Sequence, residues 1–166
     1  MDYSLSDTDM LNYMKNRTNL IQYKDIINYD NIDDLLGIYN KCILLYHTKE
    51  NYGHWTCLYR VNNTIYFFDS YGVIPDDELK FLHKDLKEEL NSNHRYLTKL
   101  LYESNNNIEY NEYQLQKKSP NINTCGRWVL LRLKYPKISI NDFHDIITKN
   151  KKYISNDLLV TKLIQI

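Results

Sequence analysis

The 166-residue chain has no long apolar run, no net charge and only three cysteines, and each of these features excludes a class of protein. No stretch is apolar over the roughly 20 residues that cross a bilayer, and residues 1–10 are acidic and polar, unlike a signal peptide. Basic and acidic residues number 21 each, so the charge does not indicate nucleic acid or an anionic membrane as the main partner. We therefore expect a protein that is not secreted and has a protein or peptide partner.

The cysteines are Cys42, Cys57 and Cys125. An odd number of widely separated cysteines is typical of free thiols in a reducing compartment and not of a disulfide framework. Alanine is absent and glycine and proline are scarce, as in proteins from AT-rich genomes. The chain has no internal repeat or linker, so its length predicts one domain over residues 1–166.

The chain is organised around residues 123–133, where turn and cap residues are followed by an apolar run with helical spacing. This pattern predicts a helix that begins at Cys125, with the side chain of Asn123 or Thr124 capping its first turn. The unpaired N–H groups and the positive end of the helix dipole favour a thiolate there. A lone cysteine beside apolar residues is more often a small core residue, so a nucleophile needs supporting groups elsewhere in the chain.

A predicted β-hairpin supplies two such groups. Residues 53–61 and 64–71 have strand composition, and the intervening Asn62 and Asn63 suit a two-residue turn. The turn sets the expected register: Val61 opposite Thr64, Leu58 opposite Phe67, Thr56 opposite Asp69 and His54 opposite Tyr71. In that register His54 and Asp69 are diagonal neighbours on one face, within reach of each other.

The other elements are predicted from caps and periodicity. We expect a helix with a Ser6–Asp9 capping box, short helix or turn structure over 19–37, an interior strand over 38–47, an amphipathic helix over 76–91, strands over 96–103 and 108–116, and helices that begin at Ser139 or Asn141 and at Ser155. A polar loop over 117–123 leads to Cys125.

A cysteine nucleophile requires a base, a group that orients the base, and donors for the oxyanion that forms on the attacked carbonyl. His54 is the candidate base, Asp69 the orienting group and Cys125 the nucleophile. The N–H of Cys125 and a glutamine amide are the candidate oxyanion donors. Gln114 and Gln116 would share one face of a strand, so periodicity does not choose between them.

Residues 53–55 (Gly-His-Trp), 68–72 (Phe-Asp-Ser-Tyr-Gly) and 124–126 (Thr-Cys-Gly), with a glutamine before the last, resemble the adenain-type viral cysteine proteases. They also resemble the related proteases that process and deconjugate SUMO and other ubiquitin-like modifiers. The resemblance covers residues 38–133. It implies an α+β fold in which a mostly antiparallel sheet packs against the cysteine-bearing helix, with a papain-like site.

The resemblance implies a triad of His54, Asp69 and Cys125. Family members have the oxyanion glutamine nearer the cysteine than it is here, which favours Gln116 over Gln114. Trp55 either lines a narrow entrance that admits a small substrate residue or is a core aromatic. Neither a cofactor nor a metal is implied, because His54 and Cys57 would point to opposite faces of a strand and no second ligand pair exists. Cys42 and Cys57 are expected in the core.

Small size and AT-rich composition are similar to the viral branch of this family, including virophages. The implied activity is that of a maturation protease that cuts capsid or core precursors, often after glycine, in the host cytoplasm, the viral factory or the virion. Adenain is helped by DNA and by a peptide, but the even charge of this chain does not indicate DNA, and no residue indicates an activating peptide. The alternatives are a ubiquitin-like-protein deconjugase and a non-catalytic binding module on the same fold.

Overall fold

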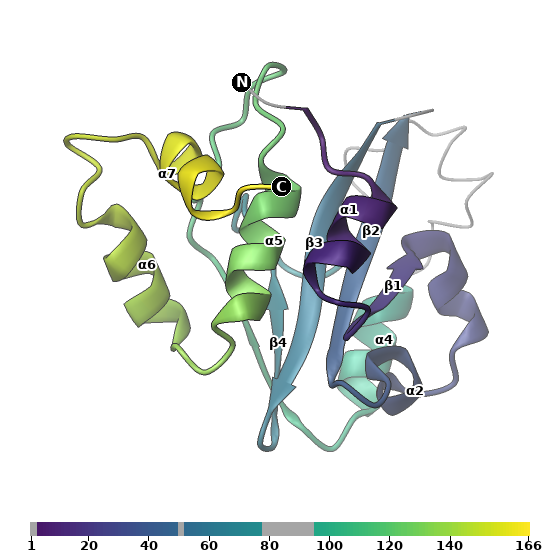
Figure 1. Ribbon diagram of the computed structural model, residues 1–166. Coiled ribbons are helices and arrows are strands. Elements are labelled where there is room, and N and C mark those ends of the chain that lie inside the picture. Colours follow the sequence, from purple (N-terminus) through teal and green to yellow (C-terminus); the bar gives the residue numbers. More distant parts are fainter. Residues whose placement is uncertain (1–2, 50–51, 78–94) are drawn as a thin grey trace.

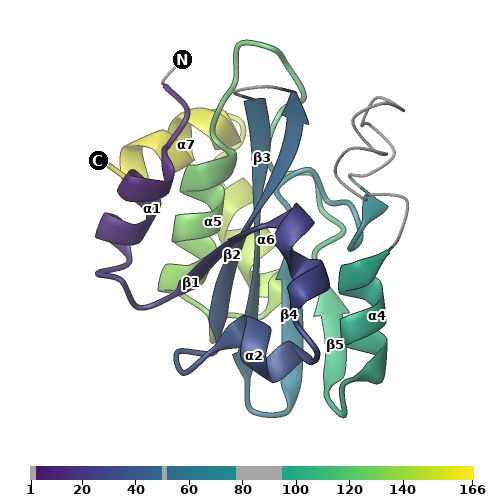
Figure 2. The ribbon, with the colours of Figure 1, turned by 90° about the vertical axis from the view of Figure 1, so that its right-hand side faces the viewer.

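A five-stranded sheet with helices on both faces forms the protein (Figures 1 and 2). The computed structural model describes residues 3–49, 52–77 and 95–166. The strands, in their spatial order, are β1 (Asn19–Gln22), β2 (Lys41–Lys49), β3 (Tyr52–Val61), β4 (Thr64–Phe68) and β5 (Asn107–Tyr110). The long pairings of β3 with β2 and with β4 are antiparallel, whereas the short edge strands β1 and β5 pair in parallel.

The helices form two layers that bury the two faces of the sheet in separate apolar cores. The layer over one face contains α1 (Asp7–Tyr13), α5 (Cys125–Lys134), α6 (Ile140–Thr148) and α7 (Asn156–Leu163), and the layer over the other contains the 3-10 helix η1 (Tyr23–Asn28), α2 (Ile32–Leu36) and α4 (Tyr96–Glu103). This arrangement confirms the α+β class. Within the described ranges, no helix is both long and apolar enough to cross a membrane.

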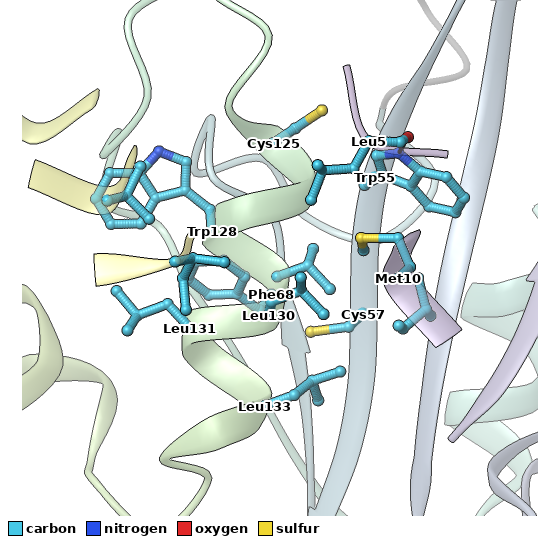
Figure 3. Close-up of a cluster of buried hydrophobic side chains, with 14 of the residues drawn as sticks. Leu5, Met10, Trp55, Cys57, Phe68, Cys125, Trp128, Leu130, Leu131 and Leu133 are labelled. Carbon is cyan, nitrogen blue, oxygen red and sulfur yellow. Dashed lines mark hydrogen bonds between the residues drawn. The ribbon is translucent and has the colours of Figure 1, made fainter. Parts of the chain in front are cut away.

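The helix α5 lies at the centre of the first layer, and its side chains fill the core that Figure 3 shows. Trp128, Val129 and Leu130 are fully buried, because this helix is covered by the sheet on one side and by α1 and α7 on the others. Cys57 is buried in the same core and Cys42 in the core of the opposite face. The core positions predicted for these two cysteines are confirmed.

Most of the caps and strands predicted from the sequence are present in the structure. Ser6 and Asp9 form the capping box of α1, and Ser139 and Ser155 cap α6 and α7 with their hydroxyls. The hairpin has the predicted register, with Val61 opposite Thr64 and Leu58 opposite Phe67. The strand expected over 38–47 lies inside the sheet as β2 but begins at Lys41, after a turn that Gly37 opens with a positive φ of 64°.

Three expectations about secondary structure were wrong. Residues 96–103 form the helix α4 and not a strand, because Leu97, Leu100 and Leu101 are spaced to bury one helical face against the sheet. Of residues 108–116, only those up to Tyr110 pair in the sheet, and the rest form a loop. The short parallel strand β1 was not foreseen within residues 19–37. The amphipathic helix expected over 76–91 lies, apart from residues 76 and 77, outside the described residues.

Candidate active site

His54 and Asp69 meet at one end of the hairpin. His54 lies on β3, and Asp69 is the first residue after β4; both side chains are buried. His54 Nε2 lies 2.9 Å from Asp69 Oδ1, and the same oxygen accepts the N–H of Tyr71 at 2.7 Å. Strand pairing stops at Phe68, the residue before Asp69. The contact that the register predicted is therefore present.

Cys125 is the first residue of α5 and completes a group of three with His54 and Asp69. Its thiol is hydrogen-bonded to His54. Because Nε2 of His54 faces Asp69, Nδ1 is the ring nitrogen left for Cys125. The backbone N–H of the first residue in a helix has no partner within that helix, so it is available as a donor. Figure 3 shows Cys125 at the end of α5 farthest from Leu133.

The surroundings of His54 favour the charged imidazolium. Burial alone would lower its pKa, but the negative charge and hydrogen bond of Asp69, followed by the interactions with Cys125, hold the pKa of His54 well above the ordinary 6.5. At Cys42 and Cys57 burial is the main influence, and it raises the pKa of these thiols and keeps them neutral. The thiol of Cys125, by contrast, is hydrogen-bonded to the imidazolium of His54.

Gln116 lies buried beside this group, and Gln114 is exposed. The side-chain oxygen of Gln116 accepts the Ser70 hydroxyl at 2.7 Å, while its amide nitrogen donates to the Tyr71 hydroxyl at 3.3 Å and to the Ile122 carbonyl at 3.2 Å. The expected strand that would have placed both glutamines on one face does not extend this far. The structure therefore separates two residues that the sequence could not distinguish.

Two loops hold Asp69 and Gln116 together. The carbonyl of Ser70 accepts the N–H groups of Leu115 at 2.9 Å and Gln116 at 3.0 Å, and the Asn111 amide donates to the Asp69 carbonyl at 2.7 Å. The loops approach so closely at Gly72 that a Cβ there would lie 2.7 Å from the Glu112 carbonyl oxygen. Gly72 also has a φ of 75°, which disfavours other residues.

The first turn of α5 is held by a residue that sequence reasoning missed. Thr124 is the N-cap residue, but neither it nor Asn123 caps the helix with a side chain, so that prediction was wrong. The Thr124 hydroxyl instead donates to Asp157 Oδ1 at 2.5 Å. Asp157 is an acidic residue in the first turn of α7, a common position that gave no sign of a distant contact. The predicted register had placed Tyr71 opposite His54, and the two rings do stack, but the contact of Tyr71 with Gln116 was missed.

Trp55 belongs to the core. Its side chain is 3% exposed, and its indole N–H donates to the Leu5 carbonyl at 3.0 Å. Trp55 therefore has the buried position of a core aromatic, and its place beside a substrate entrance stays a prediction. Within the described ranges, no group of three or more His, Cys, Asp or Glu side chains is placed to hold a metal ion.

The fold and site define an α+β protein in which a cysteine at a helix start, a histidine and an aspartate lie in contact. In sequence, the chain is 39% identical over 163 residues to "Uncharacterized protein V9" of Sputnik virophage, covering 96% of this chain and 93% of that protein. The chain therefore belongs to the family of this virophage protein. No established family model matches it.

Two solved structures are similar in overall fold, and both are proteases by name. The ASFV pS273R protease matches with a TM-score of 0.46 and 14% identity, covering 98% of this chain and 68% of its own. The C-terminal Ulp1 protease domain, solved in complex with Smt3, the yeast ortholog of SUMO, matches with a TM-score of 0.38 and 15% identity, covering 96% and 77%.

Proposed function

We propose that the chain is a cysteine endopeptidase with Cys125 as nucleophile, His54 as base and acid, and Asp69 as the group that orients His54. The observation that carries the proposal is the buried imidazole, joined to a carboxylate on one side and to a thiol at a helix start on the other. A charged histidine is costly to bury, and a strongly shifted pKa beside a cysteine supports a catalytic role more than a packing role.

The proposed reaction follows from the positions of these groups. The Cys125 thiolate attacks the carbonyl carbon of the substrate peptide, and the resulting oxyanion accepts from the Cys125 N–H and from the amide of Gln116. The carbon–nitrogen bond then breaks as His54 gives its proton to the leaving amine, which leaves a thioester on Cys125. His54 next takes a proton from water, the hydroxide attacks the thioester, and the released thiolate regains its imidazolium partner.

The oxyanion must compete for the amide of Gln116. Both amide hydrogens are already used, one on the Tyr71 hydroxyl at 3.3 Å and one on the Ile122 carbonyl at 3.2 Å. In the proposal, the oxyanion replaces the Tyr71 hydroxyl as acceptor, because that bond is the longer one and a charged acceptor binds more strongly than a neutral one.

The proposed substrates are capsid or core precursors cut at glycine-containing sites, in the host cytoplasm, the viral factory or the virion. Membership in a family with a virophage protein supports the viral setting of this proposal. The alternative substrate, a ubiquitin-like precursor, uses the same chemistry. Incubation of the purified protein with each kind of precursor, with Cys125→Ala as control, separates the two. If only the ubiquitin-like precursor is cleaved, the proposed role in maturation is wrong and the protein is a deconjugase.

The chemical part of the proposal can be tested without a substrate. We would measure the rate of alkylation of each cysteine by iodoacetamide against pH, by peptide mass spectrometry, in the wild type and in His54→Ala. We expect Cys125 to react much faster than Cys42 and Cys57 at neutral pH, and to lose this advantage in His54→Ala. If Cys125 is inert, or reacts equally well without His54, the proposed endopeptidase activity is wrong. A non-catalytic binding module on this fold is then the better account.

A further inference from the structure

Asp157 connects the two segments that carry Cys125 and Gln116. Its carboxylate lies on α7 and is 4% exposed. Oδ1 accepts the Thr124 hydroxyl at 2.5 Å and the Trp128 indole N–H at 3.3 Å, so it holds the first turn of α5. Oδ2 accepts the backbone N–H of Lys117 at 3.0 Å. Figures 1 and 2 both show α7 beside the end of α5 that begins at Cys125.

The two oxygens of Asp157 therefore serve two different parts of the site. Thr124 immediately precedes the candidate nucleophile, and Lys117 immediately follows the candidate oxyanion donor. A neutral amide at position 157 could not accept all of these bonds, because its nitrogen would face one of the donors. One buried carboxylate thus sets the position of Cys125 relative to Gln116.

The bond between Thr124 and Asp157 also affects the end of α5. Threonine at an N-cap ordinarily turns its hydroxyl oxygen to the N–H groups of the first turn and satisfies one of them. Here the hydroxyl is donated to Asp157, and no side chain caps the helix. The positive end of the helix is therefore left without a side-chain cap at the residue that would carry a thiolate and face an oxyanion.

We infer that Asp157 is a positioning residue, which fixes Cys125 through Thr124 and Gln116 through Lys117 in the geometry that the reaction needs. The inference rests on the proposed function and adds to it a residue from the C-terminal helix that does not touch the substrate. A purely structural role would give a less stable protein whose folded molecules work at the normal rate. A positioning role gives folded molecules that work slowly.

The test compares Asp157→Asn with Asp145→Asn, a matched control whose side chain is 77% exposed on α6. Two probes are used. The alkylation of Cys125 by iodoacetamide depends on the reactivity of this thiol and does not need Gln116. The hydrolysis of a fluorogenic peptide that ends in Gly-Gly-aminomethylcoumarin needs both Cys125 and Gln116. For Asp157→Asn we expect the alkylation rate of Cys125 to fall by about 10-fold and kcat by about 100-fold at unchanged KM, with the protein folded at the assay temperature. Asp145→Asn should match the wild type in both assays.

Thr124 provides a second variant if Asp157→Asn does not fold. Thr124→Val removes one donor to Asp157 but leaves the carboxylate and its bond to Lys117 in place. We expect Thr124→Val to slow both reactions and Thr124→Ser, which keeps the hydroxyl, to stay closer to the wild type. The double variant Thr124→Val with Asp157→Asn should be little slower than Asp157→Asn alone, since both remove the same contact.

The results also separate this inference from the proposed function. If Cys125 of the wild type reacts rapidly and depends on His54, while folded Asp157→Asn and Thr124→Val keep wild-type alkylation and kcat, Asp157 is structural only and the inference is overturned. If the wild-type cysteine shows no dependence on His54, the proposed function fails first and the inference fails with it. Slow alkylation and low kcat in folded variants support both.

Discussion

The phenol ring of Tyr71 lies flat against the imidazole of His54, with the ring centroids 4.5 Å apart and the planes 12° from parallel. The stack restricts the tilt of the imidazole, whose edge is fixed by Asp69. The hydroxyl of the same tyrosine accepts the amide of Gln116 at 3.3 Å. One side chain therefore contacts both the candidate base and the candidate oxyanion donor.

The two contacts of Tyr71 predict different outcomes for two substitutions. Tyr71→Phe keeps the stack and releases one hydrogen of the Gln116 amide, so we expect kcat to stay the same or rise slightly. Tyr71→Ala removes the stack and should lower kcat by about 10-fold, because the imidazole is less well oriented. Steady-state hydrolysis of the fluorogenic peptide measures both. A loss of activity in Tyr71→Phe equal to that in Tyr71→Ala would contradict the importance of the stack.

Asp69→Asn should lower kcat by about 10²- to 10⁴-fold, because the neutral amide neither stabilises the imidazolium nor fixes its orientation as the carboxylate does. Asp76→Asn is the matched control, since Asp76 is a buried aspartate that accepts from Tyr23 and from the Thr98 N–H and does not contact His54. The control should lose stability without losing kcat. Equal effects of the two substitutions on kcat would show that Asp69 has no special role.

The raised pKa of His54 predicts how stability changes with pH. Burial opposes the shift, but Asp69 raises the pKa of His54 above 6.5, so above that pH the folded protein holds a proton that the unfolded chain releases. The stabilisation is therefore complete below pH 6.5 and is lost as the pH rises through the folded pKa of His54. The free energy of unfolding should be higher with Asp69 than in Asp69→Asn, and this difference should shrink over that pH range by at most about 1.4 kcal/mol per pH unit.

Urea unfolding between about pH 5.5 and 9 measures this difference. The comparison is made in a Cys125→Ala background, so that no thiol at the site titrates. A free-energy difference that grows with pH would have the wrong sign and would show that His54 is neutral in the folded protein.

The two glutamines predict opposite results. Gln116→Ala should lower kcat by about 10²- to 10³-fold, as expected for the loss of one oxyanion donor. Alkylation of Cys125 by iodoacetamide should be little affected, because that displacement forms no oxyanion. Gln114→Ala is the control, and since Gln114 is exposed and contacts only the backbone of Gln116, its kcat should be near that of the wild type. A larger loss of kcat in Gln114→Ala than in Gln116→Ala would identify Gln114 as the oxyanion donor.

The contact between His54 and Asp69 could be predicted from the sequence because a two-residue turn fixes the register of a hairpin, and the register fixes which side chains share a face. The helix that begins at Cys125 was predicted from its apolar spacing, although the side-chain cap expected at its start is absent. In α4, by contrast, Tyr96 and Thr98, two residues with strand preference, alternate with Leu97 and Lys99. Burial of the three leucines against the sheet stabilises the helix, and this contact exists only in the folded protein.

The positions of Gln116 and Asp157 depend on contacts between distant parts of the chain. Gln116 is held in its buried position by the loop at Ser70, 46 positions earlier, and Asp157 contacts Thr124 across 33 positions. Neither contact leaves a periodic pattern, since each involves single residues at loops and helix ends. The sequence therefore predicted the types of residue in the site better than the contacts that position them.

The edge strands β1 and β5 have four residues each, although β2 and β3 between them are about twice as long. Each of these edge strands therefore offers few unpaired N–H and C=O groups to another chain, and short edge strands are one of the means by which proteins avoid sheet-to-sheet aggregation. A chain with no net charge gains little solubility from repulsion between molecules. Its short edge strands limit aggregation at high concentration in another way, because they present few backbone groups with which another chain could pair.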